Sequence, residues 1–304
     1  MSGLITKMLI FVALMVTGYF FARKDPGGGG FTKPASSLVI NVFTTATIIN
    51  SVLTVDLDLG WSQIREIMLV TWAAIGISYL AAAAAARLLP VEKEHRAGFE
   101  LLMAVPNNMF IALPVVEELF GPAAVFYCGL SNIPFNIILY TYGVWILKKG
   151  EGDGKVHLKE MFSAPLMATL IGLFLFMTRL PVPQPVRELI STIVGATVPM
   201  SMIVIGASLS TVSLFDAFKR GSLYIASFFK LLAAPLLVWL VCGFLTADPA
   251  LRLTGTIIAA SPAGILVTVL TVKYNGDAIF TSEGILHSTV LAMLTIPMLV
   301  YFLL

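Results

Sequence analysis

The sequence AVPNNMFIALP, from Ala104 to Pro114, places a proline and two asparagines inside an apolar segment long enough to cross a membrane. A second stretch, AASPAGILVTVL from Ala259 to Leu270, repeats this pattern near the other end of the chain. A proline inside a helix removes one backbone donor and clashes with the preceding turn, so both segments are predicted to break. In hydrocarbon, the freed backbone groups are tolerated only where protein or a water-filled cavity satisfies them. Two matching breaks therefore indicate a binding site near the middle of a membrane.

The composition of the 304 residues is that of a membrane protein. Hydrophobic residues make up 58% and charged residues 12% of the chain, and the mean hydropathy is +0.93, whereas a soluble domain carries about 25% charged residues. The net charge of +2 is spread over the joints between apolar segments and gives no indication of a nucleic-acid partner. The two cysteines, Cys128 and Cys242, lie in apolar stretches, so we expect no disulfide framework, no metal site and no cofactor.

Ten apolar segments of about 20 residues follow one another with short joints. We therefore predict ten transmembrane helices, at 4–21, 36–53, 64–88, 97–119, 123–147, 161–178, 186–209, 222–245, 251–272 and 278–304. Thirteen Lys and Arg residues lie in the odd-numbered joints and four in the even-numbered joints. The positive-inside rule makes the odd joints cytoplasmic. The prediction is a multi-pass protein of the cell (inner) membrane with both termini outside the cytoplasm.

Five helices in each half require the second half to enter the membrane upside down, as an inverted repeat. A Gly-rich charged joint separates the halves. The predicted units are a first five-helix repeat at 1–149, a cytoplasmic linker at 150–160 and a second five-helix repeat at 161–304.

Two correspondences support this repeat. Setting Pro106 on Pro262 aligns the two breaks, and a similar offset places Thr45 in the second helix opposite Pro199 in the seventh. The predicted fold class is an all-α membrane protein of ten helices in two inverted five-helix repeats, with broken helices four and nine.

Polar residues at the breaks are candidates for contacting a ligand. A broken helix exposes free amides at the start of its second half, where roughly half a positive charge attracts an anion. Asn107 and Asn108 can add amide donors to a carboxylate or amide oxygens to a cation, and they can equally cap unpaired backbone groups at the kink. Further candidates for the cavity wall are Asn41, Asn50, Asn132, Asn136 and Ser261. Each of these can equally form an interhelical hydrogen bond, worth about 0.6 kcal/mol.

Three titratable residues lie within predicted helices. Glu283 and His287, four residues apart, share one face of the tenth helix and are candidates for a proton-coupling pair. The alternative is an interfacial pair near the cytoplasmic end. Lys230, about two turns into the eighth helix, can neutralise a substrate or extend its long side chain to the cytoplasmic surface. The sequence leaves the coupling ion open between H⁺ and Na⁺.

The order and spacing of several motifs resemble the auxin efflux carrier family, which includes plant PIN carriers and bacterial carboxylate transporters of the bile-acid, arsenite and riboflavin transporter superfamily. The run from Pro106 to Pro114 resembles the fourth-helix motif of that family. Similar features follow at Phe135–Asn136, Tyr140–Thr141, Pro199, the IGASLS stretch at 205–210, Lys230, Pro235, Pro262, Gly264, Ile265, Lys273–Tyr274–Asn275 and Thr295–Ile296–Pro297. The resemblance covers essentially the whole chain.

The resemblance implies a scaffold of helices one, two, six and seven and a mobile transport domain of helices three to five and eight to ten. It also implies that helices four and nine cross and that an anionic substrate binds at the crossover. The matching positions are Pro106, Asn107, Asn108, Ser261, Pro262 and Ala263. Thr45 stands where many members have a proline, and Ala263 replaces the polar residue of plant carriers, which argues against plant-type auxin binding. We also predict a homodimer formed through the scaffold.

The predicted function is secondary active transport of small organic anions, either malate-like, malonate-like or auxin-like carboxylates, by elevator-type alternating access. The predicted partners are the anion and the lipid bilayer, with no nucleic acid. A channel is one alternative, and it would carry rings of polar residues along several helices, whereas the polar residues here converge on one level. An intramembrane enzyme is the other alternative. It would need paired aspartates, a metal motif or a Ser/His pair deep in the helices, and none is visible.

Overall fold

The structure is a computed structural model that describes residues 2–24, 32–54, 61–148, 164–210, 217–274 and 276–303. Within these ranges all regular structure is helical, and the extended backbone pairs only at one isolated antiparallel bridge, between Pro106 and Ala263. The predicted linker at 150–160 and Asn275 of the ninth-helix motif lie outside the described residues.

Within the described ranges, six helical stretches are long and apolar enough to cross a membrane: Pro34–Thr54, Ser62–Leu88, Pro122–Lys148, Gln184–Ala207, Gly221–Leu245 and Ala278–Leu303. Two shorter apolar helices, Leu9–Arg23 and Ala164–Thr178, match the predicted first and sixth helices. The predicted fourth and ninth helices are each divided into two pieces by a proline-containing segment. The all-helical membrane character predicted from the sequence is confirmed.

The first half of the chain contains α1 (Ser2–Arg23), α2 (Thr32–Leu38), η1 (Val39–Thr44), α3 (Thr45–Thr54), α4 (Trp61–Leu88), α5 (Arg96–Ala104), η2 (Asn108–Ala112), α6 (Leu113–Phe120), α7 (Pro122–Leu130), α8 (Asn132–Ile138), η3 (Leu139–Gly143) and α9 (Val144–Lys148). The second half contains α10 (Ala164–Thr178), α11 (Gln184–Val194), α12 (Thr197–Leu209), α14 (Gly221–Phe228), η5 (Phe229–Ala233), α15 (Ala234–Leu245), α16 (Pro249–Ala260), α17 (Leu266–Lys273) and α18 (Ala278–Leu303). The η elements are π-helical turns inside longer helices, a local irregularity that is frequent at functional sites.

Prolines determine several of the helix starts. Pro122 and Pro249 stand in the first turn of α7 and α16, where a missing backbone N–H costs no intrahelical bond. Asp248 caps α16, because its Oδ1 accepts hydrogen bonds from the backbone N–H groups of Ala250 at 2.8 Å and Leu251 at 3.4 Å.

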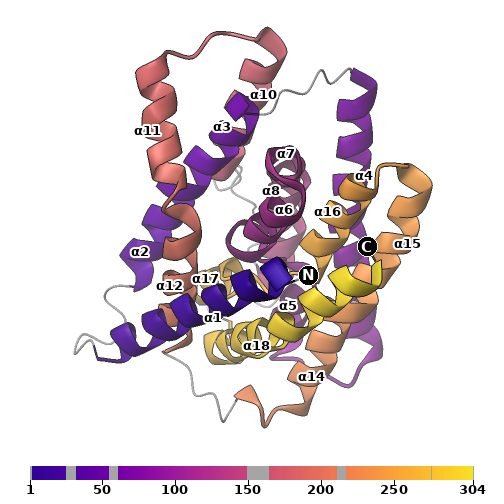
Figure 1. The fold of residues 1–304 in the computed structure, drawn as a ribbon. Coiled ribbons are helices and arrows are strands. Elements are labelled where there is room, and N and C mark those ends of the chain that lie inside the picture. Colours follow the sequence, from indigo (N-terminus) through magenta and orange to yellow (C-terminus); the bar gives the residue numbers. More distant parts are fainter. Residues whose placement is uncertain are drawn as a thin grey trace.

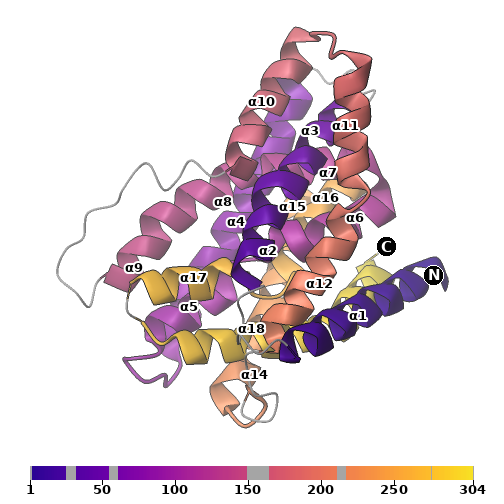
Figure 2. The same cartoon turned by 90° about the vertical axis from the view of Figure 1, so that its left-hand side faces the viewer.

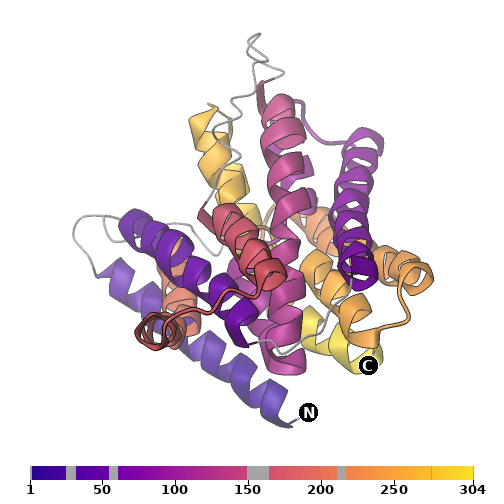
Figure 3. The ribbon, with the colours of Figure 1, turned by 90° about the horizontal axis from the view of Figure 1, so that it is seen from above.

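The helices form two side groups with a central group between them. In Figure 1, α3, α10, α11 and α12 lie on one side, α4, α15 and α16 lie on the other, and α6, α7 and α8 lie between them. Segments far apart in the sequence pack together, notably α1 with α12 and α3 with α10. Both termini lie on one side of the molecule, and the ends of α9 and α17 lie on the opposite side (Figures 2 and 3).

The apolar residues are distributed as expected for a protein in lipid. Large side chains such as Leu80, Phe174 and Phe244 are exposed on the outside, Phe244 by 89%. In contrast, every residue of α5 from Gly98 to Ala104 is buried. The segment that leads into the first break therefore lies at the centre of the molecule.

Candidate functional site at the paired helix breaks

The two proline-containing breaks lie against each other, although they are more than 150 residues apart in the sequence. The Asn107 N–H donates to the carbonyl oxygen of Pro262 at 2.7 Å, and the Gly264 N–H donates to that of Val105 at 3.1 Å. A side chain at position 264 could not be accommodated, because a Cβ there would lie 2.8 Å from the Pro106 carbonyl oxygen. We call the segments 105–107 and 262–264 the paired breaks. Their mutual hydrogen bonds satisfy backbone groups that the interrupted helices leave free.

Asn107 contributes a free donor to the paired breaks. Its side chain is 3% exposed, and among the described residues its Nδ2 has no hydrogen-bond partner. Its carbonyl oxygen accepts from the N–H groups of Ile111 and Ala112, both at 3.2 Å, so the backbone of Asn107 starts the second half of the helix. A buried amide donor without a partner costs about 1–3 kcal/mol unless something bonds to it.

Asn108, the next residue, has a structural role instead. Its Nδ2 donates to Ser131 Oγ at 2.7 Å, and its Oδ1 accepts from Cys128 Sγ at 3.0 Å. Ser131 Oγ in turn donates to the carbonyl oxygen of Cys128 at 2.6 Å. Asn108 therefore ties the broken helix to the joint between α7 and α8.

The second break has its own hydrogen bonds. Ser261 is fully buried, and its hydroxyl donates to the carbonyl oxygen of Ile258 at 2.8 Å, which closes the end of α16. The Ala263 N–H donates to Ser288 Oγ of α18 at 3.1 Å. Pro262 presents its carbonyl oxygen to Asn107. The predicted residues of the ninth helix thus lie together with Asn107.

Two other residues that were predicted to contact the substrate lie in different surroundings, one buried and one exposed. Asn136 is 3% exposed, and its Nδ2 donates to the carbonyl oxygen of Asn132 one turn earlier at 2.8 Å. Asn41 is exposed, and its Nδ2 donates to Ser37 Oγ in the same helix at 3.0 Å. No contact that the structure describes joins Asn41 to the paired breaks.

Glu283 and His287 each bind a different partner. Glu283 Oε2 lies 2.6 Å from Arg220 Nε, at the start of α14. His287 Nδ1 shares a hydrogen bond of 2.8 Å with Ser227 Oγ, and its ring lies against those of Phe218 and Tyr224. Both side chains connect α18 to the region around α14 and do not bond to each other among the described residues.

Lys230 lies in the π-helical turn η5 and is 1% exposed. Among the described residues its Nζ has no hydrogen-bond partner. Of the two alternatives for Lys230, extension of its side chain to the cytoplasmic surface does not fit this burial, since the side chain is enclosed by protein.

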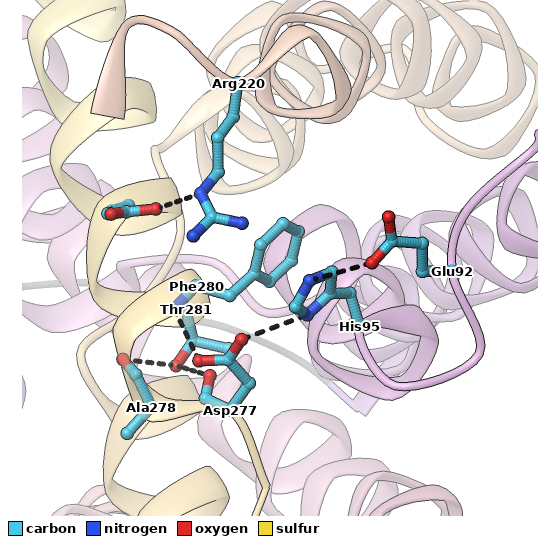
Figure 4. A network of polar contacts seen from close by, with 8 residues as sticks. Glu92, His95, Arg220, Asp277, Ala278, Phe280 and Thr281 are labelled. Atoms are coloured by element: carbon cyan, nitrogen blue, oxygen red, sulfur yellow. Dashed lines mark hydrogen bonds and ion pairs between the residues drawn. The ribbon is translucent and has the colours of Figure 1, made fainter. Parts of the chain in front are cut away.

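Sequence reasoning missed a group of residues around a cavity of about 470 Å³. This cavity lies where α5 and α18 begin and where α9 and α17 end. At its edge, His95 Nδ1 lies 3.0 Å from Asp277 Oδ2, and the His95 ring stacks on Phe280 at 4.6 Å. Figure 4 shows the Phe280 ring between the His95 imidazole and the Arg220 guanidinium, whose Cζ lies 5.8 Å from the ring centre. This network joins three joints that the charge distribution predicts to be cytoplasmic.

Glu100 of α5 also lines this cavity, is 7% exposed and accepts a hydrogen bond from the Tyr142 hydroxyl at 2.5 Å. A carboxylate in an apolar segment was a usable signal in the sequence. It was missed because Glu100 lies only four residues beyond the basic joint and could be taken for its continuation.

Comparison with known proteins identifies the family. A family model described as "Membrane transport protein" matches residues 4–300. The chain belongs to this family. It is the auxin efflux carrier family that the sequence motifs resemble, so that prediction is confirmed.

A curated relative leads to the same assignment. The chain is 24% identical over 305 residues to a protein of Methanocaldococcus jannaschii named as an uncharacterized transporter, and the match covers 96% of each chain. The protein is therefore a multi-pass membrane transporter, which fits the prediction that it is not an enzyme.

Proposed function

We propose that this transporter is a secondary active carrier of small organic anions, with malate-like, malonate-like or auxin-like carboxylates as its substrate class. The substrate binds at the paired breaks. The observation that carries this proposal is the buried Nδ2 of Asn107, which has no partner in the described part of the chain and lies where two interrupted helices meet.

The chemistry of the paired breaks favours an anion. The second halves of both interrupted helices begin there, at Asn108 and Leu266, and the first amides of a helix carry partial positive charge. The Asn107 amide adds a neutral donor of the kind that bonds to carboxylate oxygens. Lys230 adds a buried amine without a hydrogen-bond partner among the described residues, in η5, an element that packs against both α5 and α16. These donor groups support the proposal of an anionic ligand.

The helix contacts support the ten-helix inverted repeat. An offset of 154 residues, which places Thr45 on Pro199, also carries Gly18 to Gly172 and Gly206 to Val52. In the contact between α1 and α12, Gly18 packs against Ile203. In the corresponding contact between α10 and α3, Gly172 packs against Val52.

The same symmetry recurs elsewhere. Helix α4 packs on α5 just as α15 packs on α16. Corresponding helices thus pack on corresponding helices in the two halves, which is what an inverted repeat requires. The two termini lie on the same side of the molecule (Figure 3), as an even number of crossings would place them.

The mechanism that we propose for this carrier is an elevator. The scaffold would consist of α1, α2–α3, α10 and α11–α12, and the mobile domain would consist of the remaining helices, which contain both paired breaks. Moving the mobile domain would carry the bound anion across. A homodimer through the scaffold, extracytoplasmic termini and a place in the cell (inner) membrane complete the proposal.

Binding to the purified protein tests the substrate class. We expect one or more mono- or dicarboxylates to raise the apparent melting temperature, since a ligand that binds only the folded state stabilises it. Asn107→Ala removes a hydrogen bond to a charged group, worth about 1.5–3 kcal/mol, and is expected to weaken binding of that carboxylate roughly tenfold or more.

Asn41→Ala is the matched control, because Asn41 is exposed and bonded within its own helix. We expect it to bind the carboxylate like the parent. Equal affinity in Asn107→Ala and Asn41→Ala would show that the paired breaks are not the binding site.

A further inference from the structure

A buried carboxylate lines the cavity near His95 and Asp277. Glu100 lines this cavity of about 470 Å³ and is itself 7% exposed. The Tyr142 hydroxyl, from the π-helical turn η3, donates to Glu100 Oε1 at 2.5 Å. The second carboxylate oxygen receives no hydrogen bond from the described residues.

A second tyrosine extends this group into the protein. Tyr79 of α4 is 4% exposed, and its ring meets that of Tyr142 edge to face at 6.1 Å. Its hydroxyl is buried and has no hydrogen-bond partner among the described residues. Glu100 and Tyr142 thus share a hydrogen bond, and Tyr79 adds a second buried hydroxyl-bearing ring beside Tyr142.

Glu100 has no ion-pair partner among the described residues. The charged and titratable groups that share its cavity come from the joint before α5, the end of α4 and the neighbouring helices α17 and α18: Arg87, Lys93, Glu94, His95, Arg96, Tyr274 and Asp277. Of these, Asp277 is paired with His95, and Arg96 donates to the carbonyl oxygen of Ala86. Ionisable residues within membrane segments are costly and by default mark ion or proton pathways.

We propose that Glu100 is the proton-binding group that couples this carrier to a proton gradient. The proposal rests on the carrier function proposed above. A hydronium ion in the cavity transfers its proton to Glu100 Oε2 and leaves a water molecule, while Tyr142 continues to donate to Oε1. The reverse transfer returns the proton to water.

The position of Glu100 provides the link to substrate binding. Glu100 lies four residues before Ala104, the last residue of α5, which is about 6 Å along a helix. Helix α5 then leads directly into the paired breaks. A change in charge on Glu100 acts on the same helix that ends at the substrate site, so the two binding events bias the same conformational equilibrium.

Transport of radiolabelled malonate by proteoliposomes tests the proposal with Glu100→Gln. Glutamine still accepts a hydrogen bond from Tyr142 but cannot take up a proton. We expect Glu100→Gln to lose accumulation driven by a pH gradient and to keep exchange of malonate at equal concentrations on both sides. Glu94→Gln is the matched control, because Glu94 lines the same cavity but is exposed. We expect it to retain both activities.

Three transport results would overturn the proposal: accumulation by Glu100→Gln equal to the parent, accumulation driven by sodium rather than protons, or equal loss of exchange and accumulation. Tyr142→Phe keeps the carboxylate and removes its hydrogen bond. We expect this variant to shift the pH at which accumulation is half-maximal and to leave exchange unchanged.

A measurement without substrate separates this proposal from the carrier function. Infrared difference spectra of the purified protein between mildly acidic and neutral buffer should contain a protonated carboxyl band that Glu100→Gln lacks and Glu94→Gln retains. If malonate is not exchanged by the parent, malonate is not a substrate, and the infrared band alone tests whether Glu100 binds a proton. A spectrum unchanged by Glu100→Gln would refute proton binding at this residue.

Discussion

Helices α1 and α12 approach each other so closely that adding one methyl group between them is expected to lower the stability of the protein. A Cβ at Gly206 would lie 1.8 Å from the Met15 carbonyl oxygen, and one at Gly18 would lie 2.0 Å from the Ile203 carbonyl oxygen. Because a comfortable separation is about 3.5 Å, Gly206→Ala requires the two helices to move apart by roughly 1.5 Å. Both partners are backbone atoms, so no side-chain rotation can relieve the clash.

The expected cost follows from this displacement. Overpacking typically costs about 1–3 kcal/mol, and a gap of 0.5–1 Å already forfeits about a quarter to a half of the dispersion energy of the atoms beside it. At roughly 2–4 °C per kcal/mol, we expect Gly206→Ala to lower the apparent melting temperature in detergent by about 5 °C or more.

Gly76→Ala is the matched control, since Gly76 lies inside α4 and a Cβ there meets nothing within 4 Å. Alanine is the better helix former by roughly 0.5–1 kcal/mol, so this control is expected to melt at the same temperature as the parent or slightly higher. If Gly206→Ala melts no lower than Gly76→Ala, α1 and α12 do not approach each other as described.

Three further predictions concern other parts of the molecule. Asn108→Ala should lower the free energy of unfolding by about 1–3 kcal/mol, because it leaves Ser131 and Cys128 without their buried partner. The measurement is the melting temperature, and an unchanged value would contradict the structural role of Asn108. Arg220→Gln should destabilise the protein, because it leaves the Glu283 carboxylate buried and unpaired. Adding Glu283→Gln should restore part of the lost stability. Additive effects in this double-mutant cycle would show that the two side chains do not interact. A cysteine placed between residues 150 and 154 should be protected from an impermeant thiol reagent in intact cells, and one appended after residue 304 should react, whereas the opposite pattern would reverse the orientation.

Much of the fold was predictable from local sequence. Apolar length indicated the membrane segments, because burial of a helix in lipid depends on its own composition. The prolines at 106 and 262 indicated the breaks, because the loss of a backbone donor is a property of the residue itself. The predicted segments 97–119 and 251–272 accordingly contain the interruptions between α5 and η2 and between α16 and α17.

The roles of individual polar residues were much less predictable. Asn107 and Asn108 are adjacent and identical in chemistry, yet Asn108 is hydrogen-bonded on both sides of its amide and Asn107 retains a free donor. Glu283 was expected to act with His287 on its own helix, whereas Arg220 is the residue that contacts it. Helical periodicity shows which side chains share a face but cannot show which neighbouring helix that face meets.

The sequence by itself determined that this protein lies in a membrane, where its helices are interrupted and that its basic joints are unevenly distributed, since hydropathy, proline and charge act locally. Only the tertiary structure decided that the two breaks pair with each other, that Lys230 is enclosed, and that Tyr142 donates to Glu100 across 42 residues of sequence. These outcomes depend on how helices approach one another. Such approaches are governed by the summed packing of many side chains, with close contacts permitted only where residues such as Gly206 and Gly264 leave room.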